Sequence, residues 1–232
     1  SFKKNNNIII LIGNKKLIYK QMKKLGYDFN INQINDIKKA TNQNINIFNI
    51  NYKFKKTFSK ISSSSNKYIE DSFNKALKLI KLHKISKLVN GPISKKYFLK
   101  KKFTGMTEYL SDKTNSNNVS MIIYNKTLSV SPLTTHLPIK YVSKKITKTQ
   151  IIKKVKTISL FWFKRFKKKP KIAITGLNPH CESIHSFNED EKIILPSIKF
   201  LKKNNYNVSG PFPADTIFLK NNRKNFDVIV GM

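Results

Sequence analysis

Short apolar runs alternate with longer amphipathic segments along this chain of 232 residues. A buried parallel strand forms a continuous apolar run because both of its faces are covered, whereas a helix places apolar residues three or four positions apart. The runs that predict strands are 7–13, 44–50, 87–90, 119–124, 127–132, 171–175 and 227–231. The segments that predict helices are 15–25, 67–83, 147–168 and 189–203. This alternation is typical of the α/β class.

Several local signals sharpen these boundaries. Thr147 or Thr149 is expected to cap the helix over 147–168, because a side-chain oxygen at that position can accept from a free backbone N–H. Pro196 lacks an N–H, so we expect the last helix to be interrupted or adjusted there. Asn125 and Lys126 predict a tight turn between two neighbouring strands, and the serine run 62–65 predicts a loop.

The formal net charge of +34 changes this picture by raising a second class of function, a basic nucleic-acid-binding module. All but two of the 46 basic residues are lysines, the exceptions being Arg165 and Arg223. Base reading favours the planar fork of arginine, and lysine, asparagine and isoleucine share A- and T-rich codons. We therefore expect no specific nucleic-acid partner. Lysines gathered on one face would favour the binding module, and scattered lysines would favour codon bias.

Cysteine content and hydropathy bear on the compartment. Cys181 is the only cysteine, so the chain can form no internal disulfide, as is usual in reducing compartments. The longest apolar runs, such as 8–12, are far too short to cross a bilayer, and the start carries no signal-peptide pattern. We expect a cytoplasmic protein without a membrane partner.

Two histidines share one context. His136 follows the predicted strand 127–132, and His180 follows the predicted strand 171–175. Ligands of open α/β sheets bind outside the carboxyl ends of the strands, and neutral imidazoles on stiff, proline-containing loops suit a divalent metal such as Zn²⁺. Spacing alone also fits two ordinary hydrogen-bonded loop histidines, and that alternative stays open at this point.

Five strings occur in a characteristic order: Gly91-Pro92-Ile93-Ser94-Lys95, Phe103-Thr104-Gly105-Met106-Thr107-Glu108, Thr134-Thr135-His136-Leu137-Pro138, Gly176-Leu177-Asn178-Pro179-His180 and Gly210-Pro211-Phe212-Pro213-Ala214-Asp215-Thr216. Together they resemble the 4-hydroxythreonine-4-phosphate dehydrogenase family. The resemblance implies a two-domain α/β/α sandwich similar to the isocitrate and isopropylmalate dehydrogenases. It also implies a first domain over 1–100, a second over 101–214 that carries both histidines, and a return to the first domain over 215–232.

The same resemblance implies a chemistry. The family oxidises and decarboxylates 4-phosphooxy-L-threonine to 3-amino-2-oxopropyl phosphate, a step of pyridoxal 5′-phosphate (vitamin B6) biosynthesis. Its cofactors are NAD and a divalent metal (Zn, Mg or Co), its ligand is a small phosphorylated substrate, and it acts as a homodimer with residues of both subunits at each site. The chain has no Gly-x-Gly-x-x-Gly string, so a conventional Rossmann dinucleotide loop is not expected.

Matching strings assign roles to individual residues by resemblance. His136 and His180 correspond to two of three metal ligands, and the third belongs to a Tyr-His-Asp-Gln string expected beyond Met232. Thr107 corresponds to a substrate-binding threonine near the phosphate. Met106 stands where the family usually has histidine, and it cannot donate a charge-assisted hydrogen bond. We expect the chain to be truncated at both ends, with the remaining catalytic residues beyond Met232 and this piece inactive by itself.

Other residues have competing interpretations. Lys95 and Asp215 are possible cleft residues, but a solvated lysine and a cap or turn aspartate fit the sequence as well. Cys181 beside His180 is a soft metal ligand or, more simply, a small unreactive thiol. Because of Met106, a dehydrogenase for another phosphorylated hydroxy acid, such as a four-carbon sugar-acid phosphate, remains the alternative activity.

Overall fold

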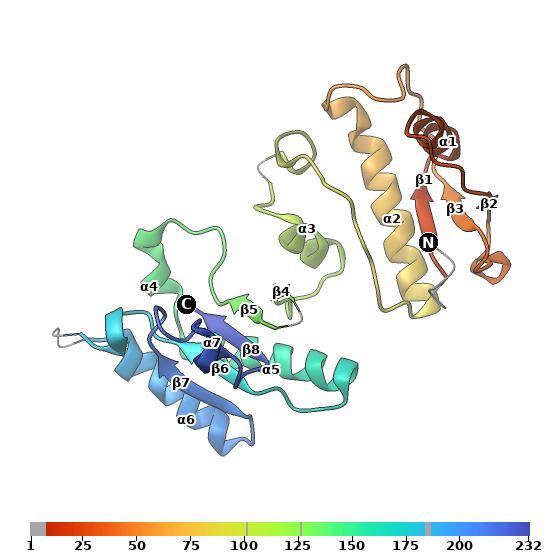
Figure 1. Cartoon of the computed structure of the whole chain (residues 1–232). Coiled ribbons are helices and arrows are strands. Elements are labelled where there is room, and N and C mark those ends of the chain that lie inside the picture. Colours follow the sequence, from red (N-terminus) through yellow and green to blue (C-terminus); the bar gives the residue numbers. More distant parts are fainter. Residues whose placement is uncertain (1–7, 101, 126, 184–186) are drawn as a thin grey trace. The chain divides into compact units, whose positions relative to one another are not determined.

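A computed structural model describes residues 8–100, 102–125, 127–183 and 187–232 (Figure 1). The chain divides into two compact units, Ser1–Tyr109 and Leu110–Met232. Each unit contains a sheet of mainly parallel strands with helices packed against it, so the predicted α/β class is confirmed. No helix in the described ranges is long and apolar enough to cross a membrane.

The first unit is built on a three-stranded parallel sheet in the order β1-β3-β2. Its strands are β1 (Ile10–Gly13), β2 (Ile31–Gln33) and β3 (Ile45–Asn49), and its long helices are α1 (Lys15–Lys24) and α2 (Asn66–His83). Helix α2 buries Phe73, Ala76 and Leu79 at three-residue spacing. Leu79 packs with Phe48 of β3, which closes a small core beneath the sheet.

The second unit contains a five-stranded sheet in the order β4-β5-β8-β6-β7. Its strands are β4 (Ile123–Tyr124), β5 (Ser129–Pro132), β6 (Ile172–Thr175), β7 (Val208–Phe212) and β8 (Val228–Gly231). Strand β4 is antiparallel to β5, and all other pairs are parallel. Strand β8 lies between β5 and β6, so the last strand in the sequence is central in the sheet.

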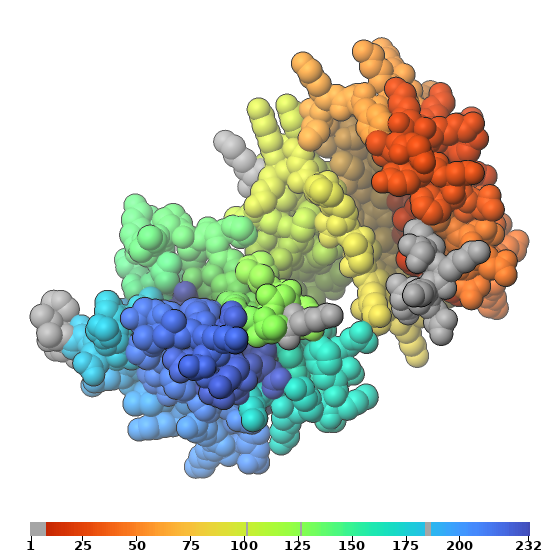
Figure 2. All heavy atoms as spheres, in the orientation of Figure 1, coloured from red at the N-terminus to blue at the C-terminus, as the bar shows by residue number. Residues whose placement is uncertain are grey.

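Alternating side chains of this sheet face two different layers. Ile172, Ile174, Val228 and Val230 pack against helices α5 (Lys148–Phe166) and α6 (Leu195–Lys203), which cover one face (Figure 1). Ala173 and Ile229 face the other side, where Ile217 packs on them. In Figure 2 the dark blue atoms of the segment around α7 (Lys220–Arg223) lie over this second face. Both faces of the central strands are therefore buried, as their apolar sequences require.

Short helical segments connect these elements. The remaining α-helices are α3 (Met106–Lys113) and α4 (Val142–Lys145). The 3₁₀ segments are Ile37–Lys39, Ser63–Ser65, Ile139–Tyr141 and Pro179–Cys181, and the π-helical segments are Lys95–Leu99 and Asp190–Ile194.

Several local predictions are confirmed. Thr147 caps α5, with its Oγ1 accepting from the Gln150 N–H at 3.3 Å. A π-helical turn precedes α6 and its Pro196, so the helix is adjusted there. In the predicted turn, Asn125 Oδ1 accepts from the backbone N–H of Thr127 at 2.8 Å, while Lys126 lies outside the described residues. The serine run, which was predicted as a loop, instead contains a 3₁₀ helix over Ser63–Ser65.

Three expectations differ from the structure. Residues 87–90 form no strand, and Val89 is 93% exposed, because a short apolar run becomes a strand only where a neighbouring strand supplies hydrogen bonds. Strands β2 and β7 were not predicted, because each is short and polar or contains Gly and Pro. Residues 215–232 do not return to the first unit; β8 pairs with β5 and β6 in the second, and the division between units falls after Tyr109.

Candidate active site

The carboxyl edge of the second sheet carries both candidate metal ligands. His136 lies in the loop after β5, and His180 lies in the 3₁₀ turn after β6. Strands β5 and β6 each pair with β8, so their ends are two interstrand spacings apart, about 10 Å. The structure therefore brings the two histidine loops to one edge, as their positions after parallel strands predicted.

Backbone hydrogen bonds continue past the strand ends and fix where each loop begins. The Leu133 N–H donates to the Gly231 carbonyl at 2.7 Å, which extends the β5–β8 ladder. The Gly176 N–H donates to the Phe212 carbonyl at 2.9 Å, which extends the β6–β7 ladder. The loops that carry the histidines thus begin at backbone that is hydrogen-bonded to the neighbouring strand.

Both histidines adopt the left-handed backbone conformation. His136 and His180 each have a φ of 56°, and Cys181 has a φ of 64°. This region costs a residue with a side chain on the order of 1–3 kcal/mol, and such residues cluster at functional sites. Both imidazoles are exposed at the sheet edge and therefore accessible to a ligand.

The donor chemistry of this edge fits a divalent metal. Two imidazoles from rigid loops are ligands that zinc and related ions accept. Among the residues that the structure describes, no group of three or more His, Cys, Asp or Glu side chains is placed to hold a metal. The assignment of His136 and His180 as metal ligands therefore stays a prediction at this point.

A buried carboxylate that the sequence analysis missed holds the His180 loop. Asp190 is 1% exposed and accepts hydrogen bonds from the backbone N–H groups of Leu177 and Asn178 and from the Asn178 side chain. The signal was weak in the sequence, because Asp190 is one of three consecutive acidic residues in a predicted helix. Its hydrogen-bond partners, Leu177 and Asn178, can be identified only from the folded structure, because they are 12 or 13 residues away in the sequence.

Cys181 lies within the electrostatic reach of acidic neighbours. Burial raises the pKa of its thiol, and the negative charges of Asp190 and Asp215 raise that pKa further. A thiol with a raised pKa stays protonated at neutral pH and is a poor metal ligand, which favours the unreactive interpretation of Cys181. Asp215 is exposed and lies in the loop after β7, whose carboxyl end is at the same edge of the sheet as that of β6.

The remaining candidates lie on other elements. Lys95 is exposed at the start of a π-helical turn, whose N-cap Ser94 accepts from the Tyr97 N–H at 3.3 Å. Met106 and Thr107 are half-buried in the first turn of α3. Glu108, which the sequence analysis did not single out, follows them; its Oε2 is buried and has no hydrogen-bond partner among the residues that the structure describes. A buried acceptor without a protein partner costs free energy unless a water or ligand group meets it.

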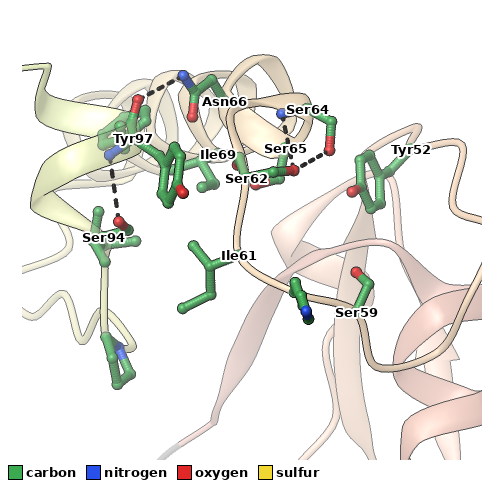
Figure 3. Close-up of a pocket in the computed structure, with 14 residues that line it drawn as sticks. Tyr52, Ser59, Ile61, Ser62, Ser64, Ser65, Asn66, Ile69, Ser94 and Tyr97 are labelled. Atoms are coloured by element: carbon green, nitrogen blue, oxygen red, sulfur yellow. Dashed lines mark hydrogen bonds between the residues drawn. The ribbon is translucent and has the colours of Figure 1, made fainter.

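A polar cavity of about 240 Å³ lies in the first unit (Figure 3). The serine run before α2 forms one wall, and Pro92, Ile93 and Ser94 form another. Asn66 donates from Nδ2 to the Tyr97 carbonyl at 2.8 Å, and its buried Oδ1 has no partner in the described part of the chain. The cavity thus adjoins the string that contains Lys95, and neither histidine lines it.

Comparisons with known proteins agree with this arrangement. A profile of the family described as pyridoxal phosphate biosynthetic protein PdxA matches residues 4–232. The 4-hydroxythreonine-4-phosphate dehydrogenase of Sulfurihydrogenibium sp. (strain YO3AOP1) is 34% identical over an alignment of 236 positions that covers 99% of this chain and 71% of that protein. A relative in Oceanobacillus iheyensis, named for D-threonate 4-phosphate dehydrogenase, is 31% identical over 161 residues, 68% of this chain and 48% of its own.

Solved structures show the same fold. The structure of 4-hydroxythreonine-4-phosphate dehydrogenase from Klebsiella pneumoniae superposes with a TM-score of 0.82 at 19% identity, covering 96% of this chain and 71% of that one. The parallel sheets and this likeness define the class of protein, one with the α/β dehydrogenase-type fold. Within that class, the chain belongs to the PdxA family of pyridoxal phosphate biosynthetic proteins.

Proposed function

We propose that this protein is the NAD-dependent dehydrogenase that converts 4-phosphooxy-L-threonine to 3-amino-2-oxopropyl phosphate in pyridoxal 5′-phosphate biosynthesis. The observation that carries the proposal is the pair of exposed histidines with left-handed backbone at one edge of the sheet, in loops that follow the two strands flanking β8, in a chain of the PdxA family. In the reaction, the C3 alcohol loses a proton and gives a hydride to NAD⁺, and the resulting β-keto acid loses CO₂.

His136 and His180 are the residues that would hold the divalent metal. Imidazole ligands favour zinc or cobalt over magnesium, which prefers oxygen ligands. A metal bound there supplies positive charge that acidifies the substrate alcohol and stabilises negative charge on its oxygen. The contribution of the chain is orientation, because ladder hydrogen bonds fix both loops at their starts.

Thr107 is proposed to donate its hydroxyl hydrogen to the substrate phosphate from the first turn of α3. Met106 offers no such donor, so phosphate contacts must come from other groups. Lys95 is exposed and suited by charge to an anionic substrate, and the exposed Asp215 follows β7 at the carboxyl edge of the second sheet. We include both as substrate-cleft residues.

A second candidate is oxidation of a four-carbon sugar-acid phosphate. Two observations favour it: the relative named for D-threonate 4-phosphate dehydrogenase, and the methionine at position 106. This substrate has a hydroxyl where 4-phosphooxy-L-threonine has its amine, so the two differ in charge next to the metal. A comparison of kcat/KM for both compounds therefore separates the candidates.

We further propose a cytoplasmic homodimer without a specific nucleic-acid partner. Exposed lysines occur on α1, α2, α5 and α6, in both units, rather than on one helix or sheet. This scatter supports codon bias over a nucleic-acid footprint, which gathers charge along one face. The homodimer and the location follow from resemblance to the family.

The test uses the full-length protein that contains this sequence. NADH formation from 4-phosphooxy-L-threonine is measured with Zn²⁺, Co²⁺ or Mg²⁺, beside His136→Ala and His180→Ala. We expect turnover in the parent, and a loss of roughly 10–100-fold or more in metal affinity in both variants. Absence of NADH formation from either phosphorylated substrate, or unchanged metal affinity in both variants, would refute the assignment.

A further inference from the structure

The buried carboxylate of Asp190 lies directly beneath the loop that carries His180. Its Oδ1 accepts from the Leu177 N–H at 2.8 Å, and its Oδ2 accepts from the Asn178 N–H at 3.0 Å and from Asn178 Nδ2 at 2.9 Å. Both oxygens are therefore used, by two consecutive backbone amides and one side chain. We propose that Asp190 is a positioning residue that holds His180 in its metal-binding conformation, an inference that rests on the function proposed above.

Asp190 is itself held in place by Asn188 and by the helical segment that it begins. The Asn188 side chain, itself 2% exposed, accepts from the Asp190 N–H at 2.9 Å and fixes the start of the helical segment. Asp190 also begins the continuous π- and α-helical run that ends at Lys203, where the helix dipole favours a negative charge. The carboxylate is thus part of a rigid element, while Leu177 and Asn178, the loop residues that it binds, are half-buried.

Gly176 shows how close this contact is. A Cβ atom built on Gly176 would come within 2.6 Å of Asp190 Oδ1 and within 2.6 Å of Cys181 Sγ. The backbone at the end of β6 can approach the carboxylate only because position 176 has no side chain. Three features therefore converge on one small volume: a glycine, a buried carboxylate and the loop backbone.

The left-handed turn explains why His180 needs such support. His180 and Cys181 both have positive φ, a conformation that persists only where the surroundings determine it. Asp190 binds the backbone two and three residues before His180, and Pro179 stiffens the link between them. Loss of the carboxylate should release the turn and let the imidazole leave its place opposite the His136 loop.

An asparagine at position 190 tests this directly. Asn has nearly the same shape as Asp, but one of its two acceptors becomes an NH₂ group that faces an N–H donor. Its matched control is Glu189→Gln, because among the described residues the neighbouring Glu189 carboxylate accepts one hydrogen bond from the loop, from Asn178 Nδ2 at 3.2 Å. We expect Asp190→Asn to bind Co²⁺ and Zn²⁺ about 10–100-fold more weakly, and Glu189→Gln to bind like the parent.

The measurement is metal affinity by competition with a chelator, together with the absorption spectrum of bound Co²⁺, at a temperature where circular dichroism shows each variant folded. A purely structural role would lower the melting temperature and leave the affinity and the spectrum unchanged, and that result overturns the proposal. His180→Ala separates the two ideas. If it loses affinity while Asp190→Asn does not, positioning is wrong; if it keeps full affinity, the metal assignment itself is wrong.

A second measurement on the parent protein covers the case in which Asp190→Asn does not fold. Amide hydrogens bonded to a buried carboxylate should exchange slowly with solvent. We expect the Leu177 and Asn178 amides to be protected although their loop lies at the sheet edge. Exchange at the rate of an open loop would show that the carboxylate does not hold this backbone, and would also overturn the proposal.

Discussion

At the scale of single residues, the most constrained position near the candidate metal site is a glycine. A methyl group on Gly176 would press on Asp190 Oδ1 and Cys181 Sγ at once. Gly176→Ala should therefore destabilise the protein by about 1–3 kcal/mol through overpacking and weaken metal binding through the displaced carboxylate. Urea unfolding and chelator competition measure the two effects.

Gly91 provides the control, since a Cβ there would meet nothing within 4 Å. Gly91→Ala should change both quantities little. Equal effects of the two substitutions would mean that the close approach at Gly176 is unimportant.

Met106 stands where the resemblance to the family implies a histidine. Met106→His should place a donor beside Thr107 and add a charge-assisted hydrogen bond to the substrate phosphate, worth about 1.5–3 kcal/mol. We expect kcat/KM for 4-phosphooxy-L-threonine to rise about tenfold or more. Met106→Leu, which adds no donor, should leave it unchanged. A histidine variant no better than the leucine variant would mean that position 106 does not face the phosphate.

Some residues of the candidate site can be recognised from the adjacent sequence, and others can be recognised only from the folded structure. His136 and His180 could be found in the sequence because each stands directly after a strand in a distinctive string. Asp190 and Glu108 could not, because the importance of each depends on burial and on which groups fold against it. A buried carboxylate and a solvated one look alike in a lysine-rich sequence until the chain is folded.

At the scale of elements, the amino-terminal end of helix α5 is capped by one threonine side chain. Thr147 accepts from the Gln150 N–H, and the structure thereby decides between the two threonines that the sequence offered. Thr147→Ala should cost about 1 kcal/mol of unfolding free energy, the usual loss for an N-cap. Thr149→Ala, inside the first turn, should be neutral or slightly stabilising because alanine is the better helix former. Chemical denaturation of both variants checks this, and equal losses would contradict it.

Elements were predicted well where burial on both faces left an unbroken apolar run. Strands β6 and β8 and helices α2 and α5 lie within a residue or two of their expected bounds. The pairing of β8 was not predictable from its own residues, because Val228–Gly231 suits a central position in either sheet. Long-range backbone hydrogen bonds to β5 and β6 decide it, and no local pattern encodes those partners.

At the scale of the whole molecule, positive charge dominates. Ion pairs such as Lys67–Asp71 at 2.8 Å and Lys168–Asp227 at 2.7 Å neutralise individual lysines. The chain has 12 acidic residues against 46 basic ones, so most lysines cannot form such a pair. The hydrogen bond with Asp71 raises the pKa of Lys67, so that lysine stays charged over a wide pH range.

Repulsion among the unpaired lysines should therefore lower the stability of the folded state at low salt. Raising NaCl from about 0.01 to about 0.15 M shortens the Debye length from about 30 Å to about 8 Å, and the melting temperature should rise. Differential scanning calorimetry measures the shift, with sucrose as an uncharged control for solvent effects. A melting temperature that is constant or falls with NaCl would mean that the lysines are too far apart to repel.

The left-handed backbone at His136 and His180 should affect the outcome of directed evolution for thermostability. Glycine tolerates that conformation without steric cost, and asparagine tolerates it better than most residues. Selection for heat resistance alone should therefore replace these two histidines early, and each replacement would yield a hardier protein with a poorer metal site. Positions 136 and 180 are where durability and catalysis should conflict most sharply, so a thermostable variant has to gain its stability elsewhere.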